Sequence, residues 1–424
     1  MASPHQAHAH SLLRFIDRSP SPYHAVESAT EFLVESDFTV VAAGTDIPTG
    51  PGRYVVPREG ALLAWIVPDG AGPGTPFHIV GAHTDSPNLR LKPNPNADAV
   101  GYRRLAVEVY GGVLLNSWLD RDLGLSGRLT VRGDDGPEVR LIRIDEPLFR
   151  LPQLAIHLDR GVNESGVQLN KQQHLCPIYG RADAPDLLTL VAERADVAEA
   201  NVIGFDLMFH DTAPSQLVGV DSAFVSAPRL DNLLSCHAAI TALSGTSPKG
   251  SIPVVALFDH EEVGSVSVTG AATDALPRLL RAISAGLGGT DADHGVALDA
   301  SLFVSADNAH ATHPNYPERH DPGHPIAMNG GPVLKFNANQ RYTTDAISAG
   351  LFRLAAERAG VETQSFVSRS DMACGSTIGP TVASSLGVRA LDVGCAQLAM
   401  HSVRELAGAN DPWDLTLILA ELLG

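Results

Sequence analysis

One short apolar run constrains the fold of this 424-residue chain more than any other feature. Residues Ile252–Phe258 read IPVVALF, with no polar position and several β-branched side chains. Such a run is typical of a strand that is buried on both faces, as in the parallel sheet of an α/β protein. It ends abruptly in Asp259, His260, Glu261 and Glu262, so charged groups follow directly on a buried strand.

The adjacent glutamates allow two interpretations. Neighbouring carboxylates at the end of a buried strand are costly unless another group offsets their charge. In the first interpretation they lie in a solvated loop before a helix N-terminus, which favours negative charge. In the second, one glutamate binds a metal ion and the other accepts a proton from a water molecule. The rest of the chain decides between the two.

The alternation of strand-like and helix-like segments predicts a mostly parallel sheet that is interrupted by a β-rich middle. Apolar positions at helical spacing indicate two helices within residues 10–36, and the α/β pattern resumes after residue 228. Between them lie short β-like segments punctuated by Gly, Asp and Pro. We therefore expect two domains, one formed by residues 1–95 and 228–424 and one inserted over residues 96–227.

Composition excludes several classes of partner and site. A formal net charge of −18 argues against nucleic acid or an anionic membrane as the main partner. No apolar run approaches the length of a membrane span, and the N-terminus lacks the basic and apolar regions of a secretory signal. The four cysteines show no CxxC spacing, which excludes a cysteine-rich zinc finger. They suit reduced thiols, so we expect a cytoplasmic protein.

Further polar residues lie just past the ends of apolar strands, where open α/β sheets bind ligands. His83 ends one strand, and Asp85 would lie on the same face of an extended chain, where it could hydrogen-bond the imidazole. Asp231 begins a helix, Asp307 follows a strand, and His401 lies in the loop after another strand. Together with the glutamate pair they match the ligand set of two divalent metals, about 3.5–4 Å apart across a shared carboxylate.

Taken singly, each of these residues has a commoner role. An aspartate such as Asp231 is more often a helix N-cap, and Asp307 would more often be a turn residue. His401 would more often be a hydrogen-bonded core histidine. Cys374, beside a glycine turn, fits a packed thiol better than a nucleophile. The repetition of one placement by chemically compatible residues favours the metal interpretation.

Seven sequence blocks resemble the aspartyl aminopeptidase family of di-zinc metallopeptidases. In chain order they are GAHTDSPNLRLKP, SAPRLDN, DHEEVGS, SADNAHATHPNYPERHD, GPVLKFNANQRYTTDA, CGSTIGP and QLAMHSVRE. The resemblance runs from about residue 10 to the C-terminus. The chain departs from the family pattern at Asn308 and in the segment SRSDMACG, and either departure could alter the shape of a substrate pocket.

The resemblance assigns roles to nine residues. The metal ligands that it implies, with Asp231 bridging, are His83, Asp231, Glu262, Asp307 and His401. Glu261 corresponds to the catalytic base, and Asp85 to the carboxylate that orients the first ligand. Lys335 corresponds to a position in the substrate pocket. His157, in the inserted domain, corresponds to a histidine that reaches the active site of a neighbouring subunit.

The resemblance also implies a fold, an activity and an assembly. The fold is a mostly parallel-sheet di-zinc peptidase domain with an inserted β-rich oligomerisation domain, assembled as a homododecamer of dimers. The activity is removal of the first residue, preferentially Asp or Glu, from short peptides with two zinc ions, for which manganese or cobalt can substitute. Three alternatives stay open: an aminopeptidase for neutral residues, another di-zinc hydrolase such as a deacylase or carboxypeptidase, and a non-catalytic oligomeric scaffold.

Overall fold

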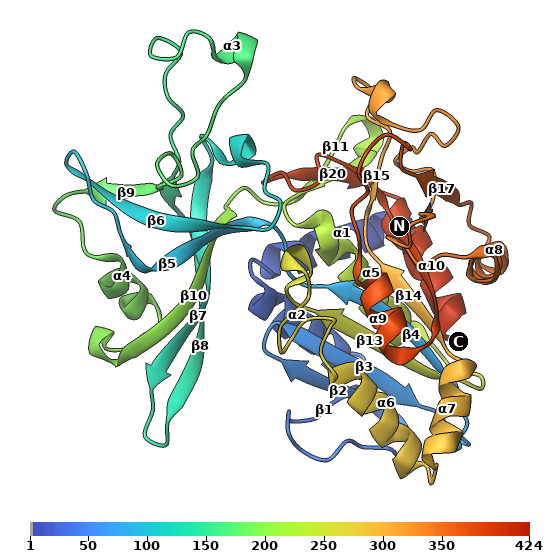
Figure 1. The fold of residues 1–424 in the computed structure, drawn as a ribbon. Coiled ribbons are helices and arrows are strands. Elements are labelled where there is room, and N and C mark those ends of the chain that lie inside the picture. The colour runs from blue at the N-terminus through green and yellow to red at the C-terminus, as the bar shows by residue number, and fades with distance from the viewer. Residues whose placement is uncertain (1–2) are drawn as a thin grey trace. The chain divides into compact units, whose positions relative to one another are not determined.

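The chain folds into two units in the structure, a computed structural model that describes residues 3–424 (Figure 1). The second unit comprises Ser86–Pro214 together with His401–Arg404, and the first unit comprises the rest of the described chain. This division reflects packing within one chain. The domain boundaries inferred from the sequence, with an inserted domain over residues 96–227, stay a prediction.

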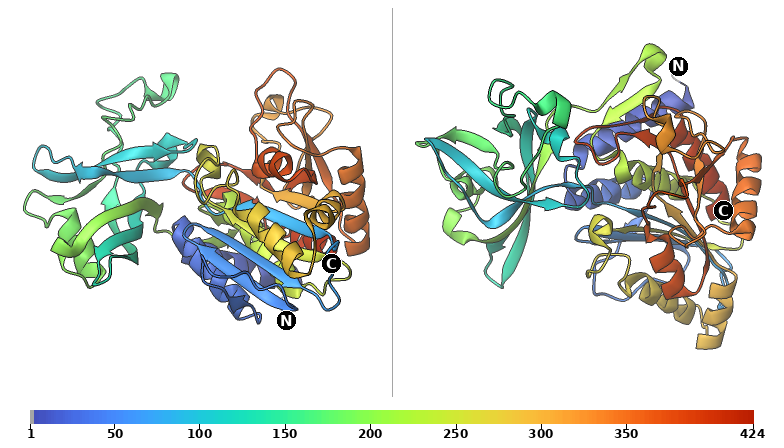
Figure 2. Two further views of the ribbon diagram at one scale, coloured as in Figure 1. Left: turned by 60° about the horizontal axis from the view of Figure 1, so that its bottom comes forward. Right: turned by 45° about the horizontal axis from the view of Figure 1, so that its top comes forward.

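A nine-stranded sheet forms the centre of the first unit (Figures 1 and 2). Its strands, in spatial order, are β1 (Thr39–Val40), β2 (Gly52–Arg58), β3 (Ala61–Val67), β13 (Ile252–Phe258), β4 (Phe77–His83), β14 (Leu302–Ala306), β18 (Arg389–Gly394), β16 (Val333–Phe336) and β17 (Gln364–Val367). The four central strands β13, β4, β14 and β18 are parallel to one another. The prediction of a mostly parallel α/β sheet is therefore confirmed.

Helices cover both faces of this sheet, which explains why its central strands are mostly apolar. One face packs against α1 (Pro4–Arg18), α2 (Pro22–Val34), α5 (Leu230–Gly245), α8 (Ala346–Ala359) and α10 (Asp411–Leu423). The other face packs against α6 (Ala275–Gly286), α7 (Asp291–Asp299) and α9 (Ile378–Leu386). Every residue of β13 is buried, as expected for a strand between two helical layers. None of the helices within residues 3–424 is long and apolar enough to cross a bilayer.

Local signals set the ends of several helices. The side chains of Ser3 and Ser21 accept hydrogen bonds from the first turns of α1 and α2, and a proline follows each serine. Asp345 caps α8 in the same way, so this helix begins at Ala346. Helix α7 was not predicted from the sequence, since its apolar residues show little helical periodicity and only His294 and Ala297 are buried.

A smaller sheet of five strands completes the first unit and was not predicted. Its strands, in spatial order, are β11 (Gln216–Val218), β12 (Phe224–Ala227), β20 (Glu405–Gly408), β19 (Ala396–Leu398) and β15 (Ala309–His310). They are two to four residues long, too short for alternation of polar and apolar residues to be recognised. Strand β15 follows β14 closely, and β19 follows β18, so both extend the chain beyond the carboxyl edge of the large sheet.

The second unit is a closed six-stranded barrel, which agrees with the predicted β-rich insertion. In order around the barrel its strands are β10 (Val202–Asp211), β5 (Asn88–Asn96), β6 (Tyr102–Tyr110), β9 (Ile178–Arg181), β8 (Pro137–Arg150) and β7 (Asp122–Arg132). A separate apolar core fills it, including Leu125, Ile144, Phe149 and Phe209. Two helices accompany the barrel: α3 (Val162–Ser165) and α4 (Leu187–Arg194).

Gly81 lies in β4 two residues before His83, at a point where the core has no room for a side chain. A Cβ atom there would lie 2.5 Å from Cζ of Phe303 and 3.0 Å from Cδ1 of Ile378. We predict that Gly81→Ala lowers the free energy of unfolding by about 1–3 kcal/mol, because overpacking forces buried neighbours to shift. Urea denaturation measures this loss. Adding Phe303→Leu, which shortens the opposing side chain, should recover part of it; a fully stable Gly81→Ala variant would contradict the packing.

Candidate metal centre

Polar residues gather where the central parallel strands end at one edge of the sheet. Strands β13 and β4 pair in register up to Phe258 and His83, so the glutamates after β13 lie beside the end of β4. Strand β14 pairs with β4 on its other side and delivers Asp307 one residue after its end. The carboxyl ends of neighbouring parallel strands thus bring together residues that are far apart in the sequence.

His83, Asp231 and Asp307 form a buried group at this edge. Nε2 of His83 lies 3.3 Å from Oδ1 of Asp231 and 3.9 Å from Oδ1 of Asp307. One ligand atom from each residue lies within 4.8 Å of the others. The exposed fractions of the three residues are 1, 3 and 8%. Asp231 is not the N-cap of α5, because that position belongs to Arg229.

Glu261 and Glu262 form a second group with the same histidine. They begin a short 3-10 turn, η4 (Glu261–Val263), and one ligand atom of each can lie within 4.8 Å of a His83 nitrogen. The turn follows His260, which adopts a left-handed conformation with φ of 62° and so bends the chain back at the end of β13. Both glutamate side chains are partly exposed, in contrast to the buried group.

Asp85 connects the two groups through both its backbone and its side chain. Nδ1 of His83 donates a hydrogen bond to the carbonyl oxygen of Asp85 at 2.9 Å. The two carboxylate oxygens of Asp85 accept the backbone N–H groups of Glu261 and Glu262, each at 3.1 Å. In the neutral form of His83, donation from Nδ1 leaves a lone pair on Nε2, the nitrogen that faces Asp231 and Asp307. The expected carboxylate–imidazole contact is the longer one, at 3.4 Å.

Three further buried residues hold the group in place. The sequence predicted this role for none of them, and Asn308 stood out only as a departure from the family pattern. Asn232 donates to the carbonyl oxygen of Ala306, which fixes the start of α5 against the end of β14. Asn308 donates to the carbonyl oxygen of Leu230 across the same junction. Glu405 accepts the backbone N–H of Asp231 at 2.9 Å. Asn232 and Asn308 directly follow Asp231 and Asp307 in the sequence, so adjacency to a candidate ligand was the available signal.

Burial and crowding of like charges shift the ionisation of these groups. Burial raises the pKa of Glu261 to about 7, and nearby carboxylates add to the shift while His83 opposes it. Burial also raises the pKa of Asp307, although Lys335 acts in the opposite direction. Burial disfavours the charged form of His83, but hydrogen bonds with Asp231 and Asp85 more than offset this and hold its pKa well above the ordinary value.

This donor set fits a divalent cation. Several carboxylates that are withdrawn from water repel one another, and a bound cation would remove both the repulsion and the unfavourable burial of charge. An imidazole nitrogen combined with carboxylate oxygens is a ligand chemistry that zinc accepts. His83, Asp231 and Asp307 would hold such an ion, and Glu261 and Glu262 would flank it.

Lys335 lies next to the buried group on β16. Its exposed fraction is 2%, and its Nζ donates to the carbonyl oxygen of Asn308 at 3.1 Å. The same nitrogen lies 3.8 Å from Oδ2 of Asp307 and 5.1 Å from the ring centroid of Tyr342. An ammonium group this close to Asp307 partly compensates the negative charge of the cluster.

The other two predicted site residues, His401 and His157, belong to the second unit. His401 lies between β19 and β20 with φ of 65°, and its Nδ1 donates to the carbonyl oxygen of Gly112 at 3.0 Å. This bond fixes the tautomer that carries a lone pair on Nε2. His157 is exposed on the segment between β8 and α3. Seven of the nine predicted residues thus lie in the first unit, at the edge of its large sheet or next to it.

The chain matches known proteins over almost its full length. Residues 15–421 match the profile of the family described as aminopeptidase I zinc metalloprotease (M18). A "probable M18 family aminopeptidase 2" of Streptomyces coelicolor is 48% identical over 427 residues, which cover 99% of this chain and 98% of the relative. A protein of the same description from Mycobacterium leprae is 49% identical over 409 residues, or 96% of each chain.

Solved structures resemble both units of the chain. A cryo-EM structure of the Ape4 and Nbr1 complex contains a chain that is 36% identical, with a TM-score of 0.95 over 99% of this chain and 86% of that one. The S. cerevisiae mApe1 dodecamer contains a chain that is 29% identical, with a TM-score of 0.85 over 99% of this chain and 97% of that one.

The two adjacent glutamates should respond differently when a metal ion binds. A ligand present at a hundred times its Kd stabilises a folded protein by about 2.7 kcal/mol, so zinc added to chelated protein should raise its Tm. We predict that Glu261→Gln keeps this increase and that Glu262→Gln loses part of it, because only Glu262 is a proposed ligand. His83→Ala should lose most of it, and Glu357→Gln, on the exposed face of α8, is the matched control. Equal losses in both glutamate variants would contradict this division of roles.

Proposed function

The chain belongs to the M18 family of zinc-dependent aminopeptidases, and from this premise we propose that it removes Asp or Glu from the N-terminus of short peptides with two zinc ions. The observation that carries the proposal is the buried group of His83, Asp231 and Asp307 beside Glu261. We propose five metal ligands in all: His83, Asp231, Glu262, Asp307 and His401. Glu261 is left as a carboxylate that binds no metal and can move protons.

The environment of Glu261 suits it to act as a general base. Its backbone N–H donates to Asp85, which holds the residue at the end of β13. Its side chain is close to the proposed ligands and partly exposed, so both water and substrate can approach it. In the proposed reaction Glu261 accepts a proton from the attacking water and returns it to the leaving amine. A positioned acid–base group of this kind contributes typically about 10²–10⁴ to the rate.

The other residues of the site orient the reactants. Zinc, when bound, supplies Lewis acidity that polarises the scissile carbonyl and makes water a stronger acid. Asp85 aligns both glutamates through their backbone N–H groups and fixes the tautomer of His83 through its carbonyl oxygen. Such outer contacts typically change metal affinity or activity about 10–100-fold when they are removed. Asp85 is therefore proposed as a positioning residue.

We propose that Lys335 confers the preference for an acidic first residue. An ammonium group carries three N–H donors, and one of those on Lys335 bonds to the carbonyl oxygen of Asn308. The remaining donors can serve Asp307, 3.8 Å away, or the carboxylate of an incoming side chain. Because Lys335 is nearly dry, a charge-assisted bond formed there would be stronger than one at the surface. A neutral first residue would gain nothing from this contact.

Substitution of Lys335 should separate substrate recognition from support of the site. We predict that Lys335→Ala, or Lys335→Met, which keeps most of the volume, lowers kcat/KM for Asp and Glu substrates about 10–100-fold. The value for a Leu substrate should change much less. Kinetics with the three aminoacyl reporters measure the difference. Equal loss on all three, together with a smaller zinc-induced increase in Tm, would mean that Lys335 neutralises Asp307 and does not select the substrate.

Peptides with a blocked N-terminus test the reaction class directly. An aminopeptidase binds the free α-amine of its substrate, so acetylation of that amine should abolish cleavage. A carboxypeptidase or a deacylase on the same fold would cleave the blocked peptide. A preference for neutral over acidic first residues would leave the aminopeptidase activity intact but remove the specificity proposed for Lys335.

We further propose that the protein acts as a homododecamer built from dimers, in which His157 completes the active site of a neighbouring subunit. The relative in S. cerevisiae forms a dodecamer. In this chain His157 is exposed, and it lies among apolar side chains that are exposed as well: Leu154 by 58%, Ile156 by 45% and Leu158 by 74%. Clustered exposed apolar side chains are typical of surfaces that bind another protein.

Mixing two inactive variants should reveal a site that is shared between subunits. His157→Ala chains retain Glu261, and Glu261→Gln chains retain His157, so a site formed from one of each is complete. After dissociation and random reassembly of equal amounts, about a quarter of the sites should be complete, and activity should recover to about that fraction of wild type. Each variant reassembled alone is the control. An active monomer in sedimentation, or no recovery in proven mixed assemblies, would contradict the proposal.

The state of the cysteines agrees with a reducing compartment. Cys176, Cys236, Cys374 and Cys395 are all free thiols in the structure, and Cys236 and Cys395 are buried. Burial raises the pKa of Cys236 to about 12, which disfavours its reactive thiolate. We propose a cytoplasmic location on this basis and on the absence of CxxC pairs in the sequence.

A further inference from the structure

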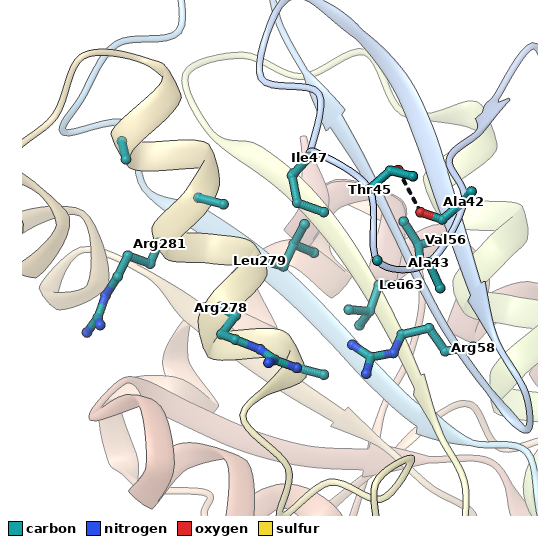
Figure 3. Close-up of a pocket in the computed structure, with 14 residues that line it drawn as sticks. Ala42, Ala43, Thr45, Ile47, Val56, Arg58, Leu63, Arg278, Leu279 and Arg281 are labelled. Atoms are coloured by element: carbon teal, nitrogen blue, oxygen red, sulfur yellow. Dashed lines mark hydrogen bonds between the residues drawn. The ribbon is translucent and has the colours of Figure 1, made fainter.

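A cavity of about 570 Å³ lies on the first unit and is separate from the metal centre in its lining (Figure 3). Helix α6 forms one wall, the loop after β1 forms the other, and strands β2 and β3 contribute to the lining. Most of the lining is apolar: Ile47, Val56, Leu63 and Leu279 line it together with several alanines. The volume lies within the range of small-molecule sites, which is about 300–1,000 Å³.

Three arginines and no acidic residue line this cavity. Arg58 is the last residue of β2, and Arg278 and Arg281 lie on α6. Figure 3 shows the guanidinium groups of Arg58 and Arg278 turned toward each other across the cavity, whereas that of Arg281 points away from them. Like charges that face each other are unfavourable unless an anion lies between them.

The arginines have little compensation from the protein itself. Among residues 3–424, neither Arg58 nor Arg281 forms an ion pair. Arg278 lies 3.4 Å from Asp274, but both side chains are more than 60% exposed, so this surface pair contributes little. The chain as a whole has 48 acidic and 30 basic residues. A purely basic lining is therefore contrary to the composition of the chain and indicates an anionic ligand.

We propose that this cavity binds a small amphipathic carboxylate, with the carboxylate between Arg58 and Arg278 and an aliphatic chain against Leu63 and Leu279. The planar guanidinium fork matches a carboxylate, and two such groups can share one anion. Val56, Leu63 and Leu279 are at most 6% exposed, so the aliphatic chain of the ligand would lie against the surface of the protein core. A polyanion is less suitable, because the lining offers Thr45 as its one uncharged polar side chain.

Decanoate is the probe for this site, and isothermal titration of the full-length protein measures its binding. We expect saturable binding of one decanoate per chain with Kd below about 1 mM. Across the series from butanoate to decanoate, affinity should rise about three- to fourfold per methylene group, as for burial of an aliphatic chain. Decan-1-ol, which keeps the chain and lacks the charge, should bind at least about tenfold more weakly.

Variants of the arginines assign the head-group contact. Arg58→Gln and Arg278→Gln should each raise the Kd of decanoate about 10–100-fold. Arg281→Gln is the matched control, because it makes the same charge change on the same helix while its side chain points away from the pair. It should leave Kd within about twofold. Ala43→Phe, at an exposed position of the lining loop, should block the cavity without disturbing the core and should abolish binding.

Three results would overturn the proposal. The first is no saturable binding of decanoate by wild-type protein at millimolar concentration. The second is equal affinity for decanoate and decan-1-ol, which would mean that the cavity binds aliphatic chains but does not recognise the carboxylate. The third is an equal effect of Arg281→Gln and Arg58→Gln, which would indicate non-specific attraction to a basic surface. None of these readouts depends on peptidase activity, so each is independent of the proposed substrate.

Discussion

The structure depends above all on the free energy of placing several carboxylates in a nearly dry position at one edge of a sheet. Asp231 and Asp307 are almost fully buried next to His83, and Glu261 and Glu262 lie beside them. Without a compensating cation these groups repel one another. Burial raises the pKa values of Glu261 and Asp307, and the neighbouring carboxylates add to the shift. A bound divalent metal would offset this repulsion, so an arrangement that is unfavourable as a protein interior would be favourable as a metal site.

The surrounding fold holds these charges in place. Four parallel strands between two helical layers end at a common edge, and backbone N–H groups, carbonyl oxygens and buried amides hold each side chain at that edge. Asp85 contributes three of these contacts, because its carbonyl oxygen and both carboxylate oxygens accept hydrogen bonds. A rigid outer layer of this kind would allow Glu261 to stay near the proposed metal ligands without binding the metal itself.

The cavity beside α6 lies on the same unit but differs from the metal centre in charge and polarity. There the charge is positive and the lining apolar, whereas the metal centre is negative and polar. The helix that carries Arg278 begins about a dozen residues after Glu262 in the sequence, and β2, which ends in Arg58, pairs with β3 next to β13. A ligand in the cavity would thus contact elements near the sheet edge that carries the candidate metal centre, although the two sites share no lining residue.

The sequence by itself determined the parallel sheet, the β-rich insertion and the candidate ligands, because long buried strands and polar residues at their ends are local patterns. It could not determine that Asp85 binds the backbone of Glu261 and Glu262, or that Glu405 and Asn308 brace the ligands, since those contacts join distant segments. The five-stranded sheet could not be predicted, because its strands are too short to show an alternation of polar and apolar residues. The basic cavity also required the tertiary structure, because Arg58 and Arg278 are 220 positions apart and only folding turns them toward each other.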